Sequence, residues 1–355
     1  MKQTIVLKIN PQEPDNEKIQ IAANIIKKGG LVAFPTETVY GLGADALNPH
    51  AISDMFKAKN RPTDNPPIIH VENIGTVHTL AEQVPPKADT LMKDFWPGPL
   101  TLVFKRSKTV PDITVAGLDT VAVRMPKHNV SLTLIKESGC PIAAPSANLA
   151  GKPSPTSAEH VFADLNGRID AILDGGPTRI GVESTVLDLS VDPPVVLRPG
   201  GTTLEALKQV LGEVMLHPFV AAEKELAVEK TRSPGMKHKH YAPKAPLIVV
   251  EGHISVVMAT VKSLITSYWL EDKRVGVLAT AETAWAYEAD VVKSLGSRRN
   301  VDAMAANLFR LLREFDEENV DVIISESVST EGLGLAVMNR LRKASGYNII
   351  KVGPA

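Results

Sequence analysis

Basic side chains gather at the end of a predicted helix. Lys57, Lys59 and Arg61 follow one another closely, and Pro62 keeps the helix from continuing. A guanidinium offers a planar fork to phosphate oxygens, and a lysine ammonium adds a mobile point charge, so the cluster could hold a nucleoside triphosphate, with Asn65 adding a neutral hydrogen bond. The same cations would complement the dipole of a solvated helix end, and the spacing alone favours neither interpretation.

Polar loops recur after predicted buried strands. They lie at residues 35–41, 145–148, 181–185 and 197–201. Serine, asparagine, glycine and proline also form ordinary turns, so any one of these loops could be a plain connection. In α/β folds, however, ligands bind at the carboxyl ends of strands. Because all of these loops have matching chemistry, they indicate a shared site for phosphate or ribose.

Two polar side chains interrupt apolar strands. His70 lies in the segment 68–71, where either a hydrogen-bonded core histidine or a ligand contact at a strand edge would fit. Arg124 ends the segment 121–124, and because an unpaired buried charge is costly, it needs an anion beside it. That anion could be a carboxylate of the protein or of a substrate, and the sequence leaves both open.

Several common catalytic motifs are absent from the sequence. No GxxxxGK[ST] loop is present, no GxGxxG follows an early strand, and there is no HExxH. Cys140 is the single cysteine, which excludes an intrachain disulfide and a cysteine-based zinc site, and we interpret it as a packing residue. His238 and His240 do not supply enough ligands for a metal, so no metal site is predicted.

The first part of the chain alternates between helix and strand. The apolar residues Ile19, Ala22, Ala23 and Ile26 recur at helical spacing and predict a helix that ends at Gly29, and a second helix is predicted over residues 51–59. Capping boxes at 156–159 and 202–205 predict two further helix starts, at Thr156 and Thr202. Buried strands are predicted at residues 31–34, 68–71, 100–104, 121–124, 142–144, 171–173, 185–187 and 195–197. So many strands between helices imply one open sheet.

A second unit follows a stretch of different character. Residues 216–246 begin with mixed charges and continue into RSPGMKHKHYAPKAP, which is too rich in specific chemistry for a plain linker. Beyond it, an amphipathic helix at 301–315 and strands at 247–250, 275–278 and 320–324 predict a small doubly wound α/β domain. A chain of 355 residues is long enough for two cores.

Composition narrows the class of protein. The content of 44% hydrophobic and 22% charged residues is ordinary for a globular protein, and no segment has the apolar length that spans a bilayer. No export signal is apparent at the start, so a cytoplasmic location and no membrane association are expected. A net charge of −1 argues against a broad surface for nucleic acid.

Together the motifs resemble the threonylcarbamoyl-AMP synthase family, in its long form. The resemblance covers nearly the whole chain. It rests on the segments PTETVYGLG (35–43), KNRP (59–62), PSAN (145–148), RPG (198–200), SPGM (233–236), HYAP (240–243) and GLAVMNRL (334–341). The fold that it implies is α/β. An open twisted mixed sheet with helices, the YrdC-like catalytic domain, would span residues 1–215, and a linker, 216–246, would lead to a small Rossmann-like domain, 247–355.

The resemblance implies a nucleotidyltransferase. L-threonine, bicarbonate and ATP would give threonylcarbamoyl-AMP and pyrophosphate, the first step toward N6-threonylcarbamoyladenosine in tRNA. The threonine carbamate would attack the α-phosphate, so the protein has mainly to position reactants and stabilise charge. Mg²⁺ is expected to arrive with ATP. A downstream threonylcarbamoyl transferase is expected to receive the intermediate, and direct binding of tRNA is allowed but not required.

The same resemblance assigns residues to the two substrates. Threonine would be held by Thr38, His70, Arg124, the backbone of Ala144 and Ser184, with Arg124 pairing with its carboxylate. ATP would be held by Arg61, Asn65, Thr120, Ser146, Ser154, Arg198 and Tyr241. Lys59 would neutralise the phosphates, and Lys59 and Arg61 would be the catalytic pair. Because Tyr241 belongs to the linker, residues 232–244 are expected to fold over the active site as a lid.

Two alternative functions would use the same residues. YrdC-like folds also resemble double-stranded RNA binders, in which Lys59, Arg61, Arg124 and Arg198 would contact RNA phosphates without catalysis. The net charge and the 5% content of aromatic residues weigh against that alternative. Carbamoyl transfer from carbamoyl phosphate occurs in YrdC-like domains of hydrogenase-maturation proteins. The absence of flanking zinc-finger and acylphosphatase-like segments weighs against it.

Overall fold

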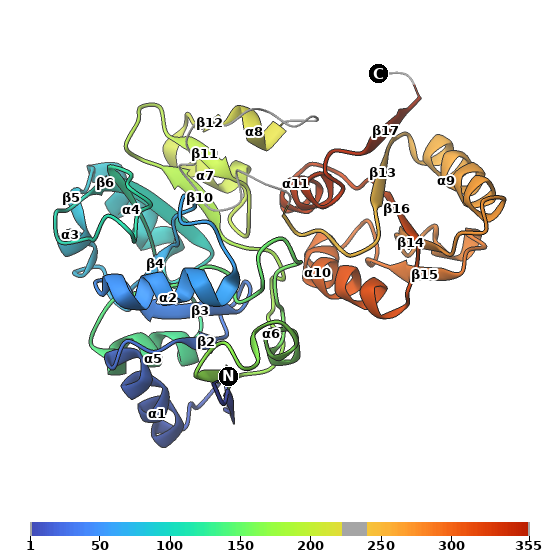
Figure 1. Cartoon of the computed structure of the whole chain (residues 1–355). Coiled ribbons are helices and arrows are strands. Elements are labelled where there is room, and N and C mark those ends of the chain that lie inside the picture. Colours follow the sequence, from blue (N-terminus) through green and yellow to red (C-terminus); the bar gives the residue numbers. More distant parts are fainter. Residues whose placement is uncertain (1, 222–239, 354–355) are drawn as a thin grey trace.

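The computed structural model describes residues 2–221 and 240–353, which form a larger and a smaller sheet with helices around each (Figure 1). The larger sheet is mixed and has the order β1-β9-β2-β3-β8-β4-β7-β6-β10-β11-β12, with β5 paired to β6. Its strands are β1 (Ile5–Lys8), β2 (Val32–Phe34), β3 (Gly41–Asp45), β4 (Ile69–His70), β5 (Ala81–Gln83), β6 (Leu100–Arg106), β7 (Thr120–Arg124), β8 (Ile142–Ala143), β9 (Ala171–Asp174), β10 (Thr185–Asp188), β11 (Val195–Arg198) and β12 (Met215–Leu216). The prediction of one open sheet is confirmed.

Helices cover both faces of the larger sheet. They are α1 (Asn16–Lys27), α2 (Pro49–Lys59), α3 (Val77–Leu80), α4 (Pro86–Phe95), α5 (Asn129–Ser138), α6 (Ala158–Leu165), α7 (Leu204–Leu211) and α8 (Pro218–Ala221). Side chains alternate along each strand, so Val32 and Phe34 of β2 pack with α1 and α5, whereas Leu31 and Ala33 pack in the core that includes α2 and α6. Strands buried on both faces explain the nearly continuous apolar runs in the sequence.

The smaller sheet is parallel in all its described pairs and has the order β15-β14-β16-β13-β17. This confirms the predicted doubly wound domain. Its elements are β13 (Leu247–Gly252), α9 (Ile254–Trp269), β14 (Val275–Ala279), η1 (Ala284–Ala286), β15 (Val291–Ser294), α10 (Val301–Glu317), β16 (Val322–Glu326), α11 (Gly334–Ala344) and β17 (Ile349–Val352). Figure 1 shows α10 and α11 on the side toward the larger sheet and α9 on the far side.

The two sheets share a hydrophobic cluster. Val39 and Val182 come from loops of the larger unit, yet they are buried in the same cluster as Leu308 and Phe309 of α10. Tyr241 lies in that cluster as well. The smaller unit is therefore packed against the loops of the larger one.

Two helix starts differ from their prediction by one residue. The N-cap of α6 is Ser157, whose side chain accepts from the His160 amide, and the N-cap of α7 is Thr203, which accepts from the Ala206 amide. The capping boxes had placed Thr156 and Thr202 in those positions. The error arose because two hydroxyl residues stand side by side at each start, and only the second one lies within reach of the third amide of its helix.

The predicted linker is described only in part. The boundary predicted between residues 215 and 216 falls inside β12, which pairs with β11, and the domain limits stay a prediction. Residues 222–239, which hold most of the predicted lid and also His238, lie outside the described residues. Within the described residues, no helix has the length and apolar character needed to cross a membrane.

Candidate active site

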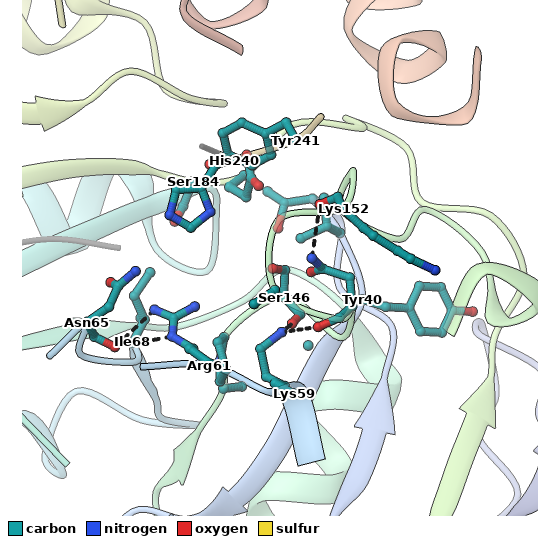
Figure 2. Close-up of a pocket in the computed structure, with 18 of the residues that line it drawn as sticks. Tyr40, Lys59, Arg61, Asn65, Ile68, Ser146, Lys152, Ser184, His240 and Tyr241 are labelled. Atoms are coloured by element: carbon teal, nitrogen blue, oxygen red, sulfur yellow. Dashed lines mark hydrogen bonds between the residues drawn. The ribbon is translucent and has the colours of Figure 1, made fainter. Parts of the chain in front are cut away.

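Most of the predicted site residues surround one cavity of about 340 Å³ at the carboxyl end of several strands of the larger sheet (Figure 2). The predicted residues that line it are Thr38, Lys59, Arg61, Asn65, His70, Arg124, Ala144, Ser146, Ser184, Arg198 and Tyr241. Figure 2 shows Ser184, His240 and Tyr241 across the cavity from Lys59 and Arg61. The polar loops that the sequence singled out therefore converge.

Two predicted residues do not line the cavity. Ser154 is fully buried behind the wall, where its hydroxyl donates to Glu183 Oε1 at 2.6 Å. Thr120 is half-buried and begins β7, whereas Arg124 ends that strand. At the usual rise per residue this places Thr120 about 13 Å from Arg124. The structure does not bring Thr120 to the cavity because it lies at the opposite end of its strand.

Lys59 connects the basic cluster to the polar turn. It is the last residue of α2, and Asn60 then reverses the chain in the left-handed conformation at φ 49°. The buried Nζ donates to the carbonyl oxygens of Ser146 and Asn148 (Figure 2). Burial, together with the nearby Arg61 charge, holds the pKa of Lys59 well below its usual value. Lys59 thus fixes the turn, and its direct contact with phosphates stays a prediction.

Arg61 lies beyond the helix end and keeps its guanidinium at the cavity. Its Nε and Nη2 donate to the carbonyl oxygen of Asn65 at 3.3 Å and 3.0 Å. Burial lowers the pKa of Arg61 to about 10, which leaves it charged at neutral pH. The Asn65 side chain is buried, and its Oδ1 has no hydrogen-bond partner in the structure. Arg61 can therefore donate, and Asn65 Oδ1 can accept, toward a ligand in the cavity.

Arg124 is paired with a carboxylate of the protein. Its Nη2 lies 2.7 Å from Glu37 Oε1, and both side chains are only 4% exposed. Nη1 donates to the Thr38 hydroxyl at 3.0 Å, and Nε donates to the Gly98 carbonyl at 3.1 Å. Of the two anions that the sequence left open, the internal one is present. These contacts leave further N–H donors on Nη1 and Nη2 for a second anion.

His70 is buried at the end of β4. Its Nδ1 is 3.2 Å from the Ile68 carbonyl oxygen, and its ring meets Phe34 edge to face at 6.1 Å between centroids. Burial, reinforced by the charge of Arg124, lowers the pKa of His70 to about 3, so the imidazole is neutral at physiological pH. His70 is both a hydrogen-bonded core histidine and a cavity-lining residue, so the two interpretations are compatible.

Arg198 and Ser184 form another part of the wall. Nε and Nη2 of Arg198 donate to the Ser184 carbonyl oxygen at 3.2 Å and 3.0 Å, and Nη2 lies 3.2 Å from the Ser184 hydroxyl. That hydroxyl also contacts Thr101 Oγ1 at 2.8 Å. A cation and a hydroxyl are therefore fixed together where β10 begins and β11 ends.

Tyr241 closes the cavity from the linker. It is 5% exposed, has a φ of +66°, and stacks on Phe309 of α10 at 5.2 Å between centroids. The Arg340 guanidinium of α11 lies 5.6 Å from its ring centroid. The part of the predicted lid that is described thus packs between the cavity and the smaller unit.

Several functional neighbours were missed by the sequence reasoning. Glu37 and Glu183 stood inside quoted motifs but received no role, and Lys152 and Arg340 received none either. Burial raises the pKa of Glu183, but the charges of Arg340 and Arg198 outweigh it and bring the pKa to about 2. The signal for Glu37 and Glu183 was a carboxylate in an otherwise apolar and hydroxyl-rich segment, since such a group needs a partner.

No cluster of metal-binding side chains occurs among the described residues. Glu183 lines the cavity, but its Oε1 accepts from Ser154 and its Oε2 accepts from Arg340 at 2.9 Å. Cys140 is half-buried, and burial raises the pKa of its thiol to about 12, which agrees with a packing role.

Comparisons with known proteins match both parts of the chain. Residues 24–200 match the family model described as "Telomere recombination", and residues 202–346 match "Threonylcarbamoyl-AMP synthase, C-terminal domain". The threonylcarbamoyl-AMP synthase of Pyrococcus abyssi is 54% identical over 345 residues, which cover 97% of this chain and 99% of the relative. That of Bacillus subtilis is 51% identical over 339 residues, covering 95% of each.

A solved structure supports the same assignment. The crystal structure of P. abyssi Sua5 complexed with L-threonine matches with a TM-score of 0.94 and 53% identity, covering 99% of this chain and 100% of that one. These relatives favour the catalytic interpretation over an RNA-binding module. The chain therefore belongs to the threonylcarbamoyl-AMP synthase family, in the form that carries a C-terminal domain.

Proposed function

We propose that this chain is an L-threonylcarbamoyladenylate synthase that converts L-threonine, bicarbonate and ATP to threonylcarbamoyl-AMP and pyrophosphate. The observation that carries the proposal is the composition of the cavity. It joins a buried arginine flanked by hydroxyls, which suits an amino-acid carboxylate, to separate cations and hydroxyls that suit a triphosphate. The product would serve formation of N6-threonylcarbamoyladenosine in tRNA.

The threonine side of the cavity consists of Thr38, His70, Arg124, Ala144 and Ser184. We assign the substrate carboxylate to the remaining Nη donors of Arg124, because Glu37 and Thr38 already hold that guanidinium in one orientation. A neutral His70 adds a polar contact without a competing charge. A preorganised buried site of this kind favours one small amino acid over larger ones.

The nucleotide side consists of Lys59, Arg61, Asn65, Ser146, Ser154, Arg198 and Tyr241. Arg61 and Arg198 supply the guanidinium groups for phosphate oxygens, and Lys59 holds the turn that presents Ser146. Ser154 acts through Glu183, since its hydroxyl is directed to that carboxylate. Thr120 begins β7, whereas Arg124 ends that strand at the cavity, so the geometry does not support a contact between Thr120 and ATP.

The chemistry asks mainly for positioning and charge stabilisation. The threonine amine condenses with bicarbonate, which loses a C–O bond and releases water, and gives a carbamate. The carbamate oxygen then attacks the α-phosphorus of ATP. A P–O bond forms there as the bond to the β-phosphate breaks, and pyrophosphate leaves. Arg61, Arg198 and Lys59 would stabilise the charge that builds on the phosphates, in a site partly shielded from water.

Mg²⁺ would enter with ATP and neutralise phosphate charge. The lining carboxylate among the described residues, Glu183, already accepts hydrogen bonds at both oxygens, which favours a metal carried by the nucleotide over one held by the protein. Threonylcarbamoyl-AMP would then pass to a downstream threonylcarbamoyl transferase, because a mixed anhydride of this type is too reactive to accumulate.

The decisive experiment measures pyrophosphate release from purified protein with ATP and Mg²⁺, leaving out threonine or bicarbonate in turn. Release should require both, and threonylcarbamoyl-AMP should be detected by mass spectrometry. Equal release under every omission would overturn the proposed reaction. Serine performing as well as threonine would overturn only the choice of amino acid.

A further inference from the structure

An arginine of the smaller unit reaches into the wall of the cavity. Arg340 of α11 is fully buried. Its Nε donates to Glu183 Oε2 at 2.9 Å, and its Nη1 donates to the Pro199 carbonyl oxygen at 2.8 Å. Both acceptors belong to the polar loops that meet at the cavity, and Pro199 directly follows Arg198. One guanidinium therefore ties two loops of the nucleotide side together.

A second arginine makes the same pair of contacts on another loop. Arg313 of α10 donates through Nη2 to the Pro153 carbonyl oxygen at 2.6 Å and to Asp164 Oδ2 at 2.8 Å. Asp164 is buried, and its Oδ1 accepts from Lys152 at 2.8 Å. Lys152 lines the cavity, and Ser154 follows Pro153 in the chain. Each arginine thus binds one carbonyl oxygen and one carboxylate of the larger unit.

The backbone at this interface is too close for side chains. A Cβ on Gly181 would lie 2.4 Å from the Ala305 carbonyl oxygen of α10, and one on Gly200 would lie 2.2 Å from the Glu183 carbonyl oxygen. Such approaches are possible only at glycine. The loops that carry Glu183 and Arg198 therefore lie directly against each other and against the smaller unit.

We propose that Arg340 and Arg313 are positioning residues for the nucleotide side of the cavity, so that the smaller domain completes the ATP site. The inference rests on the proposed function. Arg340 lies against the ring of Tyr241. It also donates to Glu183, which accepts from Ser154, and to Pro199, which follows Arg198. Tyr241, Ser154 and Arg198 are all assigned to ATP. Among the described residues, Thr38, His70 and Arg124 of the threonine side make no hydrogen bond or ion pair with Arg340 or Arg313.

The test is Arg340→Met, with Arg342→Met as its matched control. Arg342 lies on the same helix and makes a bidentate pair with Glu251 of β13, at 2.8 Å and 2.9 Å, within the smaller unit. The Arg340 variant should raise the KM for ATP by roughly tenfold or more and that for threonine by less than about threefold. The Arg342 variant should change neither KM, even if it lowers the thermal midpoint of unfolding.

A double-mutant cycle separates positioning from general loss of structure. If Arg340 acts through Glu183, then Arg340→Met should add little to the ATP defect of Glu183→Gln, and Arg340→Lys should recover only part of the affinity because it lacks the fork. Arg313→Met should give a smaller rise in the KM for ATP, since Lys152 still pairs with Asp164. Arg310→Met on the exposed face of α10 is its control.

The outcomes that would overturn the inference are concrete. Parental KM values in Arg340→Met, or an equal rise for both substrates, would reduce Arg340 to a residue that only holds the domains together. Fully additive effects in the cycle would do the same. Calorimetry with ATP and without threonine measures ATP affinity in the absence of turnover. It therefore tests the role of Arg340 separately from the proposed reaction. If the wild-type chain binds ATP but makes no threonylcarbamoyl-AMP, only the proposed reaction is overturned.

Discussion

The threonine side and the nucleotide side of the cavity are built from different parts of the chain. Arg124, Glu37 and Thr38 hold one another through side chains of the larger unit, and Val39, next to Thr38, packs in the shared hydrophobic cluster. On the nucleotide side, the buried carboxylate Glu183 depends on Arg340 of α11, and Tyr241 depends on Phe309 of α10. The comparison teaches that key side chains of one substrate site can be held within the catalytic sheet, while those of the other are held across a domain interface.

The largest effect is expected from breaking the threonine side at Arg124. In Arg124→Gln, Glu37 would remain buried without its charge partner, which costs about 3–5 kcal/mol in the free energy of unfolding. Threonine-dependent pyrophosphate release should fall at least about a hundredfold. Urea denaturation and calorimetry with threonine measure the two effects separately.

A second substitution distinguishes stability from binding at this position. The double variant Arg124→Gln with Glu37→Gln removes both charges, so it should regain most of the lost stability. Threonine binding should not return, because the guanidinium is still missing. Parental threonine affinity in either variant would remove Arg124 from the threonine side.

A smaller and more selective effect is expected at Arg61. Arg61→Ala removes a cation whose hydrogen bonds within the described part of the chain go to the Asn65 carbonyl oxygen, so the fold should stay intact. The KM for ATP should rise by roughly tenfold to a hundredfold, with threonine affinity unchanged. Lys57→Ala is a suitable control, since that exposed lysine pairs with Asp54 one turn earlier on the same helix end. Wild-type kinetics for Arg61→Ala would show that the basic cluster at the end of α2 is a solvated helix end without a role in ATP binding.

The smallest effect concerns stability against acid. Burial lowers the pKa of His70 to about 3 in the folded chain, whereas an exposed histidine has a pKa of 6.5. As the pH falls, the unfolded chain therefore takes up a proton before the folded chain does. The free energy of unfolding should therefore decline below pH 6.5, by on the order of 2 kcal/mol at pH 5. Glu183, with a folded pKa of about 2, contributes stability that is lost only below 4.5.

The stability that His70 contributes should accordingly be lost at a higher pH than the stability that Glu183 contributes. Urea denaturation between pH 7 and pH 4 checks this order. His70→Gln should make the decline between pH 6.5 and pH 5 shallower, and part of it should remain because burial also lowers the pKa of His160 to about 4. Substitution of the exposed His50 by Gln is the control and should leave the slope as in the parent. The same slope in all three proteins would show that another group titrates there.

The sequence predicted the parts of the fold that are governed by local pattern. The helix α1 buries the residues that its spacing indicated, Ile19, Ala22, Ala23 and Ile26. By contrast, β3 was not predicted, because its segment GLGAD has no β-branched residue and two glycines. Its place is set by pairing with β2 on one side and with β8 on the other. The partner β8 lies about a hundred residues further along the chain.

The site was predictable to a similar extent. Polar loops after buried strands were visible in the sequence, and so was the need of Arg124 for an anion. The identity of that anion as Glu37, and the pairing of Glu183 with Arg340, depend on tertiary contacts that no local spacing encodes. The role of Lys59 as a donor to two carbonyl oxygens was hidden for the same reason, since a lysine beside an arginine looks like a phosphate contact.

The shared hydrophobic cluster has a consequence for folding. Val39 and Val182 complete a core whose other members lie mainly in α10, α11 and the smaller sheet. Neither unit can expose its side of this cluster without stripping apolar contacts from the other, so the two would unfold in one cooperative transition. A cut between the two units would leave apolar surface of this cluster exposed on both fragments.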